Sequence, residues 1–186
     1  MSISRSTATV QCLERLVSVL QEHLPTFLAD IADEGLRLTA PHSGDYHISG
    51  GYLADQILNG SVHVLIDQFE RSRAETKLSG DGTTYGIVVT LPVRIRIVFA
   101  SEAYDPLDRI GRDQTKPEFS YFLSERYKGA LMDALYTHAR DGDTISELEI
   151  TSDYASVETI REQMTGGCIL ELRITQVTHV PSPKYS

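Results

Sequence analysis

The histidines are the first side chains whose types and spacing could support chemistry. His42 and His47 lie five positions apart in a segment rich in glycine and proline, and His63 follows later in the chain. Histidine pairs that bind a metal ion usually lie about four residues apart on a helix, or in a tight loop backed by carboxylates. Asp45 is the only acidic residue between His42 and His47. The sequence therefore favours solvent-exposed loop histidines, and we expect no metal site.

The two cysteines, Cys12 and Cys168, would need a neighbouring base or a CxxC pair to act as nucleophiles. Neither has such a partner close by in the sequence. Two cysteines are also too few for a disulfide framework or a four-ligand zinc set. We expect both to be buried structural thiols.

The segment Gly80-Asp81-Gly82-Thr83-Thr84 is similar to the Asp-x-Gly-Thr turn of sugar-kinase and actin-like ATPases. That fold needs two large halves and more chain than 186 residues. Asp-Gly is also a strong signal for a hairpin turn, and this is the interpretation we favour. The glycine patterns of phosphate loops, dinucleotide-binding folds and hydrolases do not occur in the sequence. The sequence therefore gives no support to a phosphate-binding loop, a dinucleotide-binding fold or a hydrolase nucleophile turn.

Acidic residues form two runs, and a pair of carboxylates could act as general acid and base. Nothing in their spacing places two of them on one pocket wall, so we interpret both runs as solvated surface. The runs comprise Glu102, Asp105, Asp108 and Asp113, followed by Asp141, Asp143, Glu147, Glu149 and Asp153.

Arg94 and Arg96 are different because both lie on the polar face of a predicted strand. Apolar residues occupy every odd position from Tyr85 to Phe99, which is typical of a strand with one buried face. At about 3.3 Å per residue the strand would span roughly 50 Å, so we expect it to project beyond the domain body. Pro92 cannot donate to a ladder and marks an edge or a bulge. If the polar face is a subunit contact, Arg94 and Arg96, with Glu102 nearby, are natural ion-pair partners.

Hydrophobic periodicity predicts the elements that position these residues. We expect two helices over 9–23 and 25–34, divided at Pro25, and a further helix over 118–140. Strands are expected over 61–70, 144–151 and 168–179, and a short helix over 153–164 that ends at Gly166-Gly167. The segment 71–82 is rich in turn residues, and loops are expected over 35–60, with a helical turn near 52–58, and over 101–117. The order is α-(α)-β-β-α-β-β. It predicts an α+β fold, in which a mostly antiparallel sheet with a long projecting strand or hairpin packs against two main helices.

Length and composition limit the class of protein. The 186 residues, with 41% hydrophobic residues, favour a single α+β domain over 1–180 and an extended tail over 181–186. The net charge of −9 disfavours binding to nucleic-acid phosphates or to anionic membranes. No stretch approaches the roughly 18 apolar residues of a membrane span, and no secretory leader is evident, so we expect a soluble chain.

The order of elements resembles that of the tail-terminator or tail-completion (neck) proteins of tailed bacteriophages. The likeness is carried by the helix Leu13–Ile31, the strand Tyr85–Phe99, the helix Phe119–His138 and the strand Cys168–His179. These segments cover most of the chain, as an ordering of elements without a signature motif.

The resemblance implies a structural virion protein without catalysis or cofactor. Such proteins form a homo-oligomeric ring, of six subunits here, that caps the tail tube and joins it to the neck or head connector. The implied partners are further copies of the chain, the tail tube protein, the neck or connector protein and the tail sheath. DNA would pass through the channel without specific binding, because an acidic surface repels phosphates.

We expect contacts with other subunits or partners along the long strand and the loop after it. The predicted contact residues are Arg94, Arg96, Phe99, Glu102, Tyr104, Asp105, Arg109 and Arg112. Three other interpretations stay open. The chain could be a different neck or baseplate adaptor, or a cytosolic interaction module that pairs strands with a partner near Pro92. It could also be a small α+β enzyme or ligand-binding domain, with a pocket lined by Tyr46, His47, Tyr104 and Asp105.

Overall fold

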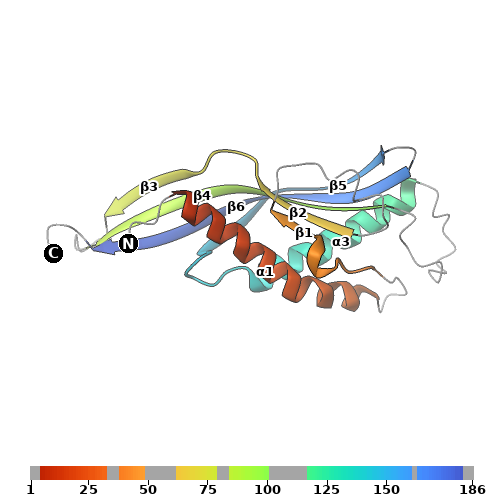
Figure 1. Ribbon diagram of the computed structural model, residues 1–186, viewed down its shortest axis with the longest axis horizontal. Helices are drawn as coiled ribbons and strands as arrows, with labels where there is room; N and C mark the ends of the chain where they lie inside the picture. Colours follow the sequence, from red (N-terminus) through yellow and green to blue (C-terminus); the bar gives the residue numbers. More distant parts are fainter. Residues whose placement is uncertain are drawn as a thin grey trace.

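The computed structural model describes residues 5–32, 38–48, 62–78, 84–100, 117–160 and 163–181 (Figure 1). Two long helices lie against a six-stranded sheet that is antiparallel except for the β1–β2 pair, which confirms the predicted α+β fold. The elements are α1 (Arg5–Ala32), the 3-10 turn η1 (Ser43–Asp45), β1 (Tyr46–Ile48), β2 (Val62–Gln68), β3 (Arg73–Leu78), β4 (Thr84–Ala100), α3 (Pro117–His138), β5 (Glu147–Ile160) and β6 (Gln163–Pro181). Neither described helix combines the length and apolar composition of a membrane-spanning segment.

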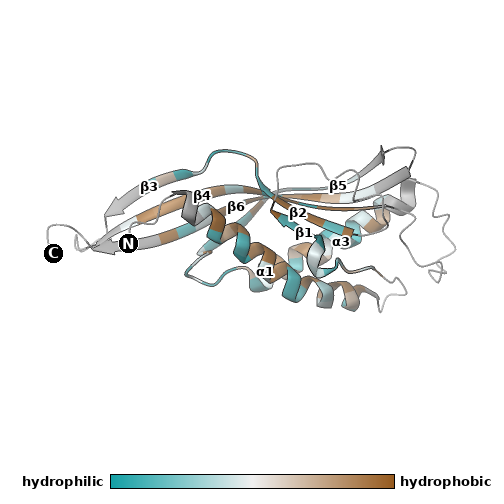
Figure 2. Cartoon of the chain, viewed as in Figure 1, coloured by the Kyte–Doolittle hydropathy of each residue, from teal (hydrophilic) through white to brown (hydrophobic). Residues whose placement is uncertain are grey.

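The sheet has the strand order β1-β2-β4-β6-β5, and β3 pairs with β4 beyond the end of β2. Side chains alternate between the two faces of a strand, so one face collects the apolar set. Figure 2 shows hydrophobic residues along β2 and β4 and alternating hydrophobic and hydrophilic residues along α1. Both helices cover this apolar face. The core there includes Leu16, Leu20, Leu24, Val64, Ile66, Leu91, Val93, Ile95, Ile97, Phe99, Tyr127, Leu131, Leu170 and Leu172.

The first helix is continuous, so the prediction of two helices divided at Pro25 is wrong. α1 runs from Arg5 to Ala32 with Pro25 inside it. Proline removes one backbone hydrogen bond from a helix and disfavours the turn before it. Leu24 and Leu28, on either side of Pro25, are nevertheless fully buried in the core. We infer that the packing of this face on the sheet outweighs the local cost of the proline.

The predicted short helix over 153–164 is also wrong, because β5 continues as a strand to Ile160 and pairs with β6. β6 begins at Gln163 and passes through Gly166 and Gly167 without a break. These two glycines pair with Phe99 and Val98 of β4, so they are part of the ladder. Their missing side chains let the neighbouring strand and α3 come close, as described below.

The strand partner of β4 is interrupted opposite Pro92. β2 ends where Gln68 pairs with Val93, and β3 begins where Arg73 pairs with Thr90. Four residues of one chain segment thus lie opposite the two residues Leu91 and Pro92. Proline has no amide hydrogen to donate to a ladder, which explains an irregularity at this point. β3 itself lies in the segment that we expected to be turn-rich, and the Asp81-Gly82 turn lies outside the described residues.

The sheet extends beyond the helical layer as an arm made of β3, the first half of β4 and the last part of β6 (Figure 1). β4 spans 17 residues and β6 spans 19. Their ladder is continuous from Ala100↔Thr165 at one end to Thr84↔Pro181 at the other. The arm is the feature that most distinguishes this chain from a compact two-layer domain.

Candidate functional site: the polar sheet face and the arm

The sheet face opposite the helices carries a row of paired charges. Asp67 of β2, Arg94 of β4 and Glu171 of β6 are direct cross-strand neighbours. Arg94 donates through Nη2 and Nε to Glu171 Oε1, at 2.7 and 3.2 Å. Arg96 Nη2 lies 3.5 Å from Asp67 Oδ2. The polar face that strand alternation predicts is therefore present, and its two arginines have acidic partners within the same chain.

Arg94 is held in this row by more than one contact. Its guanidinium lies 4.9 Å from the centre of the Phe69 ring, a cation–π distance. The hydrogen bond to Glu171 raises the pKa of Arg94 above its ordinary value, although burial acts in the opposite direction. Arg94 and Arg96 are thus structural members of the sheet face. Both have acidic partners within the same chain, so neither is an unpaired cation at the surface.

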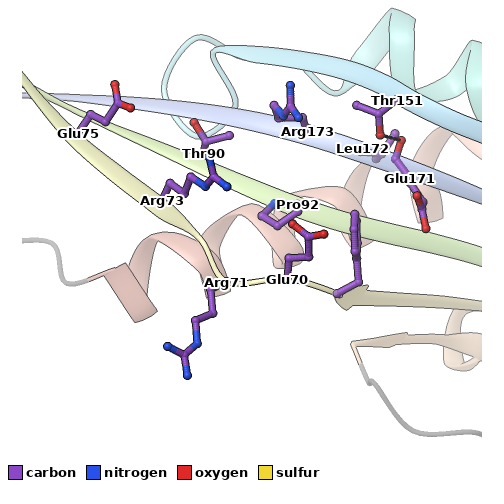
Figure 3. A pocket seen from close by; sticks show the side chains of 11 residues that line it. Glu70, Arg71, Arg73, Glu75, Thr90, Pro92, Thr151, Glu171, Leu172 and Arg173 are labelled. Atoms are coloured by element: carbon purple, nitrogen blue, oxygen red, sulfur yellow. Dashed lines mark hydrogen bonds between the residues drawn. The ribbon is translucent and has the colours of Figure 1, made fainter.

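A hollow of about 500 Å³ lies on this face where the arm joins the body (Figure 3). It forms beside the interruption between β2 and β3, and Pro92 lines it. Charges of both signs surround it: Glu70, Arg71, Arg73, Glu75, Glu171 and Arg173. An irregularity in β5 places Thr151 at the far wall, where its Oγ1 donates to Glu171 O at 3.0 Å. A mixed lining of this kind suits a polypeptide segment better than a single anion.

The predicted contact residues have different outcomes. Phe99 is fully buried in the core, with its ring centre 5.0 Å from that of Tyr127, so it is not on a surface available to a partner. Glu102, Tyr104, Asp105, Arg109 and Arg112 lie outside the described residues.

Tyr46 and His47 do not line one pocket together, because their side chains lie on opposite faces of the sheet. The two are neighbours on β1, and Tyr46 faces the core, where its hydroxyl donates to Leu20 O at 3.3 Å. His47 pairs with Leu65 of β2 and faces the opposite side of the sheet. Tyr104 and Asp105, the other two residues of the predicted pocket, lie outside the described residues.

Both thiols are buried, as predicted. Burial, with a smaller contribution from Asp141, raises the pKa of Cys12 to about 11. Burial also raises the pKa of Cys168 to about 12. At neutral pH both therefore remain protonated, which makes them poor nucleophiles.

Three side chains that the sequence spacing did not connect lie together at the β1 edge. Asp45, at the end of η1, and His47, on β1, meet His63 of β2, and their ligand atoms all lie within 4.8 Å of one another. His47 Nε2 is 3.3 Å from His63 Nδ1, and His63 Nδ1 is 3.7 Å from Asp45 Oδ1. His42 is exposed, as expected, and lies outside this cluster. The prediction of exposed loop histidines is wrong for the other two, because His47 is half-buried on β1 and His63 is buried on β2.

The pairing of β1 with β2 creates this cluster, and a short parallel pair leaves little trace in a sequence. The available signal is the Asp-x-His spacing at the start of a strand, with a second histidine on the same face of its partner. Because His47 pairs with Leu65, both His47 and His63 point to the same side.

No family model matches the chain, and no curated protein matches its sequence. Its function is therefore argued from the geometry above.

Proposed function

We propose that this chain is a structural protein of a tailed-phage virion, a tail terminator that assembles into a ring on the tail tube and connects it to the neck. The observation that carries the proposal is the arm, whose strands extend beyond the two helices (Figure 1). No described helix covers the arm, and a small sheet with an uncovered apolar face is rarely stable by itself, so a neighbouring subunit is the natural cover.

The arm carries apolar side chains on both of its faces. Val88 of β4 and Val177 of β6 are cross-strand neighbours on the polar side of the sheet, and both are half-buried. Ile87, on the other side, is also half-buried and packs at the margin of the core. Apolar surface on a projecting segment is a frequent sign of an interface between proteins.

Exposed charges on the two sheet edges can complement each other, which favours head-to-tail association. Among the described strands β5 has a ladder partner on one side only, and Glu147, Glu149 and Asp153 are exposed along it. On the other side of the sheet, Arg71 and Arg73 are exposed at and before β3, next to the exposed Glu70 and Glu75. Contact between the arginines of this edge and the acidic residues of β5 in the next copy would be heterologous, and such contacts close into rings when the rotation fits.

The overall charge supports the same proposal. A ring around a DNA channel must let the genome pass without holding it, and a net charge of −9 disfavours binding to phosphates. The proposed partners are the tail tube, the neck or connector protein and the sheath, and the ring would have six subunits.

The proposal is tested by the mass of the protein in solution, measured by light scattering after size exclusion over a concentration series, followed by negative-stain imaging. We expect a species of about six times 20.7 kDa, alone or on purified tail tubes. A chain that stays at 20.7 kDa under both conditions contradicts the proposal.

A charge exchange tests the edge contact itself. Arg73→Glu and Glu147→Lys should each weaken assembly, and the double variant should restore it, because both residues are exposed on opposite edges. Arg140→Glu, an exposed arginine after α3, is the matched control and should assemble normally. If the double variant assembles no better than either single variant, the two edges do not meet. Arg94→Glu is unsuitable here, since it would place two carboxylates together at Glu171 within the subunit.

A ligand-binding or interaction module is the second candidate, and the charged hollow of about 500 Å³ is the observation that favours it. It predicts a stable monomer that binds a peptide at the arm root, where Arg71→Ala would weaken binding without changing mass.

A further inference from the structure

We propose that Asp45, His47 and His63 form a binding site for a divalent transition-metal ion of the Zn²⁺ class. Two imidazoles and a carboxylate are ligands that Zn²⁺ takes in proteins. The inference does not depend on the ring proposal, because it rests on these three side chains alone.

The distances between the ligand atoms fit one ion. Around a tetrahedral Zn²⁺ with bonds of about 2.0–2.1 Å, neighbouring ligand atoms lie about 3.3–3.4 Å apart. His47 Nε2 and His63 Nδ1 are 3.3 Å apart, and His63 Nδ1 and Asp45 Oδ1 are 3.7 Å apart. These two distances are thus within a few tenths of an ångström of the tetrahedral value, and the third, between His47 and Asp45, is at most 4.8 Å.

The segment that carries Asp45 is fixed by its own hydrogen bonds. The His42 amide donates to Asp45 Oδ2 at 3.1 Å, and the Asp45 amide donates to His42 O at 2.9 Å. One carboxylate oxygen is thus used to hold the turn, while Oδ1 faces the histidines. Such an outer hydrogen bond orients a metal-ligating carboxylate and is a regular feature of metal sites.

Two contacts to α1 hold the same segment against the body. Gln21 Nε2 donates to Ser43 O at 2.9 Å, and the Tyr46 hydroxyl donates to Leu20 O at 3.3 Å. His63 is 4% exposed on β2, so its ring position is set by the sheet. Ligands that are positioned before the ion arrives lose little conformational entropy on binding, which favours affinity.

A bound ion would join β1 to the sheet by a bond that the ladder does not provide. β1 is three residues long and lies at an edge of the sheet. Among the described residues the cluster supplies three ligands, so a tetrahedral ion keeps a fourth position for water or for a group from another molecule.

The test uses the full chain after treatment with a chelator, titrated with Zn²⁺ by calorimetry and with Co²⁺ by visible absorption. We expect one ion per chain, a Co²⁺ spectrum of the intense tetrahedral type, and a higher melting temperature with Zn²⁺. His47→Ala and Asp45→Asn should each lower the Zn²⁺ affinity at least tenfold. Asn keeps the oxygen that accepts the His42 amide, so this variant retains the turn.

His42→Ala is the matched control, since it removes an exposed histidine five residues from His47 and keeps the backbone amide that Asp45 binds. It should bind Zn²⁺ like the unchanged chain. Loss of binding in His42→Ala but not in His47→Ala overturns the proposal, as does the absence of saturable binding in the unchanged chain.

A measurement without substitutions covers the case in which a variant does not fold. In the unchanged chain labelled with ¹⁵N-histidine, Zn²⁺ should shift His47 Nε2 and His63 Nδ1 and leave the ring of His42 unaffected. If those two nitrogens do not shift at saturating Zn²⁺, their proximity is only a histidine–histidine hydrogen bond.

Discussion

Gly166 of β6 provides the sharpest test of the packing between the sheet and α3. A Cβ built at this glycine would lie 2.5 Å from Phe99 Cε2 and 3.1 Å from Ser124 Oγ. Real Cβ atoms essentially never approach another heavy atom within 3.0 Å, so Gly166→Ala forces a shift. Phe99 cannot turn away freely, because its ring is fully buried against Tyr127.

The magnitude follows from two opposing effects. Replacing glycine by alanine within a regular strand or helix ordinarily stabilises by about 0.5–1 kcal/mol. Inserting a methyl group into a close-packed core costs about 1–3 kcal/mol. The two ranges leave a net loss of about 0–2.5 kcal/mol, centred near 1 kcal/mol. At about 2–4 °C per kcal/mol, the central value lowers the melting temperature by about 2–4 °C.

The assay is urea and thermal unfolding followed by circular dichroism, with Gly129→Ala as the control. Gly129 lies on α3, and a Cβ there meets nothing within 4 Å, so this variant should gain about 0.5–1 kcal/mol. The two alanines are thus expected to act with opposite sign. In the Gly166→Ala background, Phe99→Leu should cost less than it does alone, because it relieves the clash. If Gly166→Ala is as stable as the unchanged chain, a clash with the Phe99 ring does not explain why glycine occupies this position.

Three further predictions concern buried polar groups and titration. Burial alone would raise the pKa of Asp141, but hydrogen bonds from the backbone amides after it outweigh this and hold the pKa below its ordinary value. Asp141→Asn should therefore cost about 1 kcal/mol near pH 7, and the difference should vanish below about pH 4 in acid-unfolding curves. Hydrogen bonds from Lys128 to Glu125 and Asp153 raise its pKa from 10.5 to about 12, so the loss of stability between those pH values should be smaller in Lys128→Met than in the unchanged chain. Tyr127→Phe removes the hydroxyl that donates to Thr39 O at 2.7 Å and should cost about 1–2 kcal/mol in urea unfolding.

Much of the fold could be predicted from elements whose pattern is long and regular. The alternation from Tyr85 to Phe99 indicated a long strand, and the structure places β4 over Thr84–Ala100. Apolar periodicity likewise indicated the helix that appears as α3 over Pro117–His138. These segments are predictable because one face of each is buried along its whole length.

The wrong predictions fall where pairing or packing with another element decides the conformation. Val157, Ile160 and Met164 have the spacing of a helix face, but the first two lie on β5 and Met164 lies on β6, and these strands pair with each other. Gly166 and Gly167 are typical of a break. Only the positions of the Phe99 ring beside Gly166 and of the Ile97 carbonyl beside Gly167 show why glycine is needed there. β1 was missed because three residues carry no periodicity.

The candidate sites also combine features that a local pattern predicts with features that depend on residues elsewhere in the chain. The face that carries Arg94 and Arg96 was predictable from alternation, but the partner Glu171 is 77 residues further along the chain. Asp45, His47 and His63 are brought together by a parallel pairing across a segment of 16 residues, measured from His47 to His63. Spacing arguments within one helix or loop could not connect them.

The strand order also relates the two proposals to each other. β2 and β3 follow one another along the same side of β4, and β1 lies outside β2 alone. The edge of the sheet on this side therefore has a step: β1 lies one strand further out, next to β2. Among the described strands, none lies next to β3 at the corresponding position. A strand from a neighbouring subunit that paired with β3 would run in line with β1, so β1 would limit how far it could extend. A metal ion that holds β1 to β2 would fix that limit, and rings assembled with and without Zn²⁺ should then differ in stability. Rings that are equally stable in both conditions would mean that the metal site serves the subunit alone.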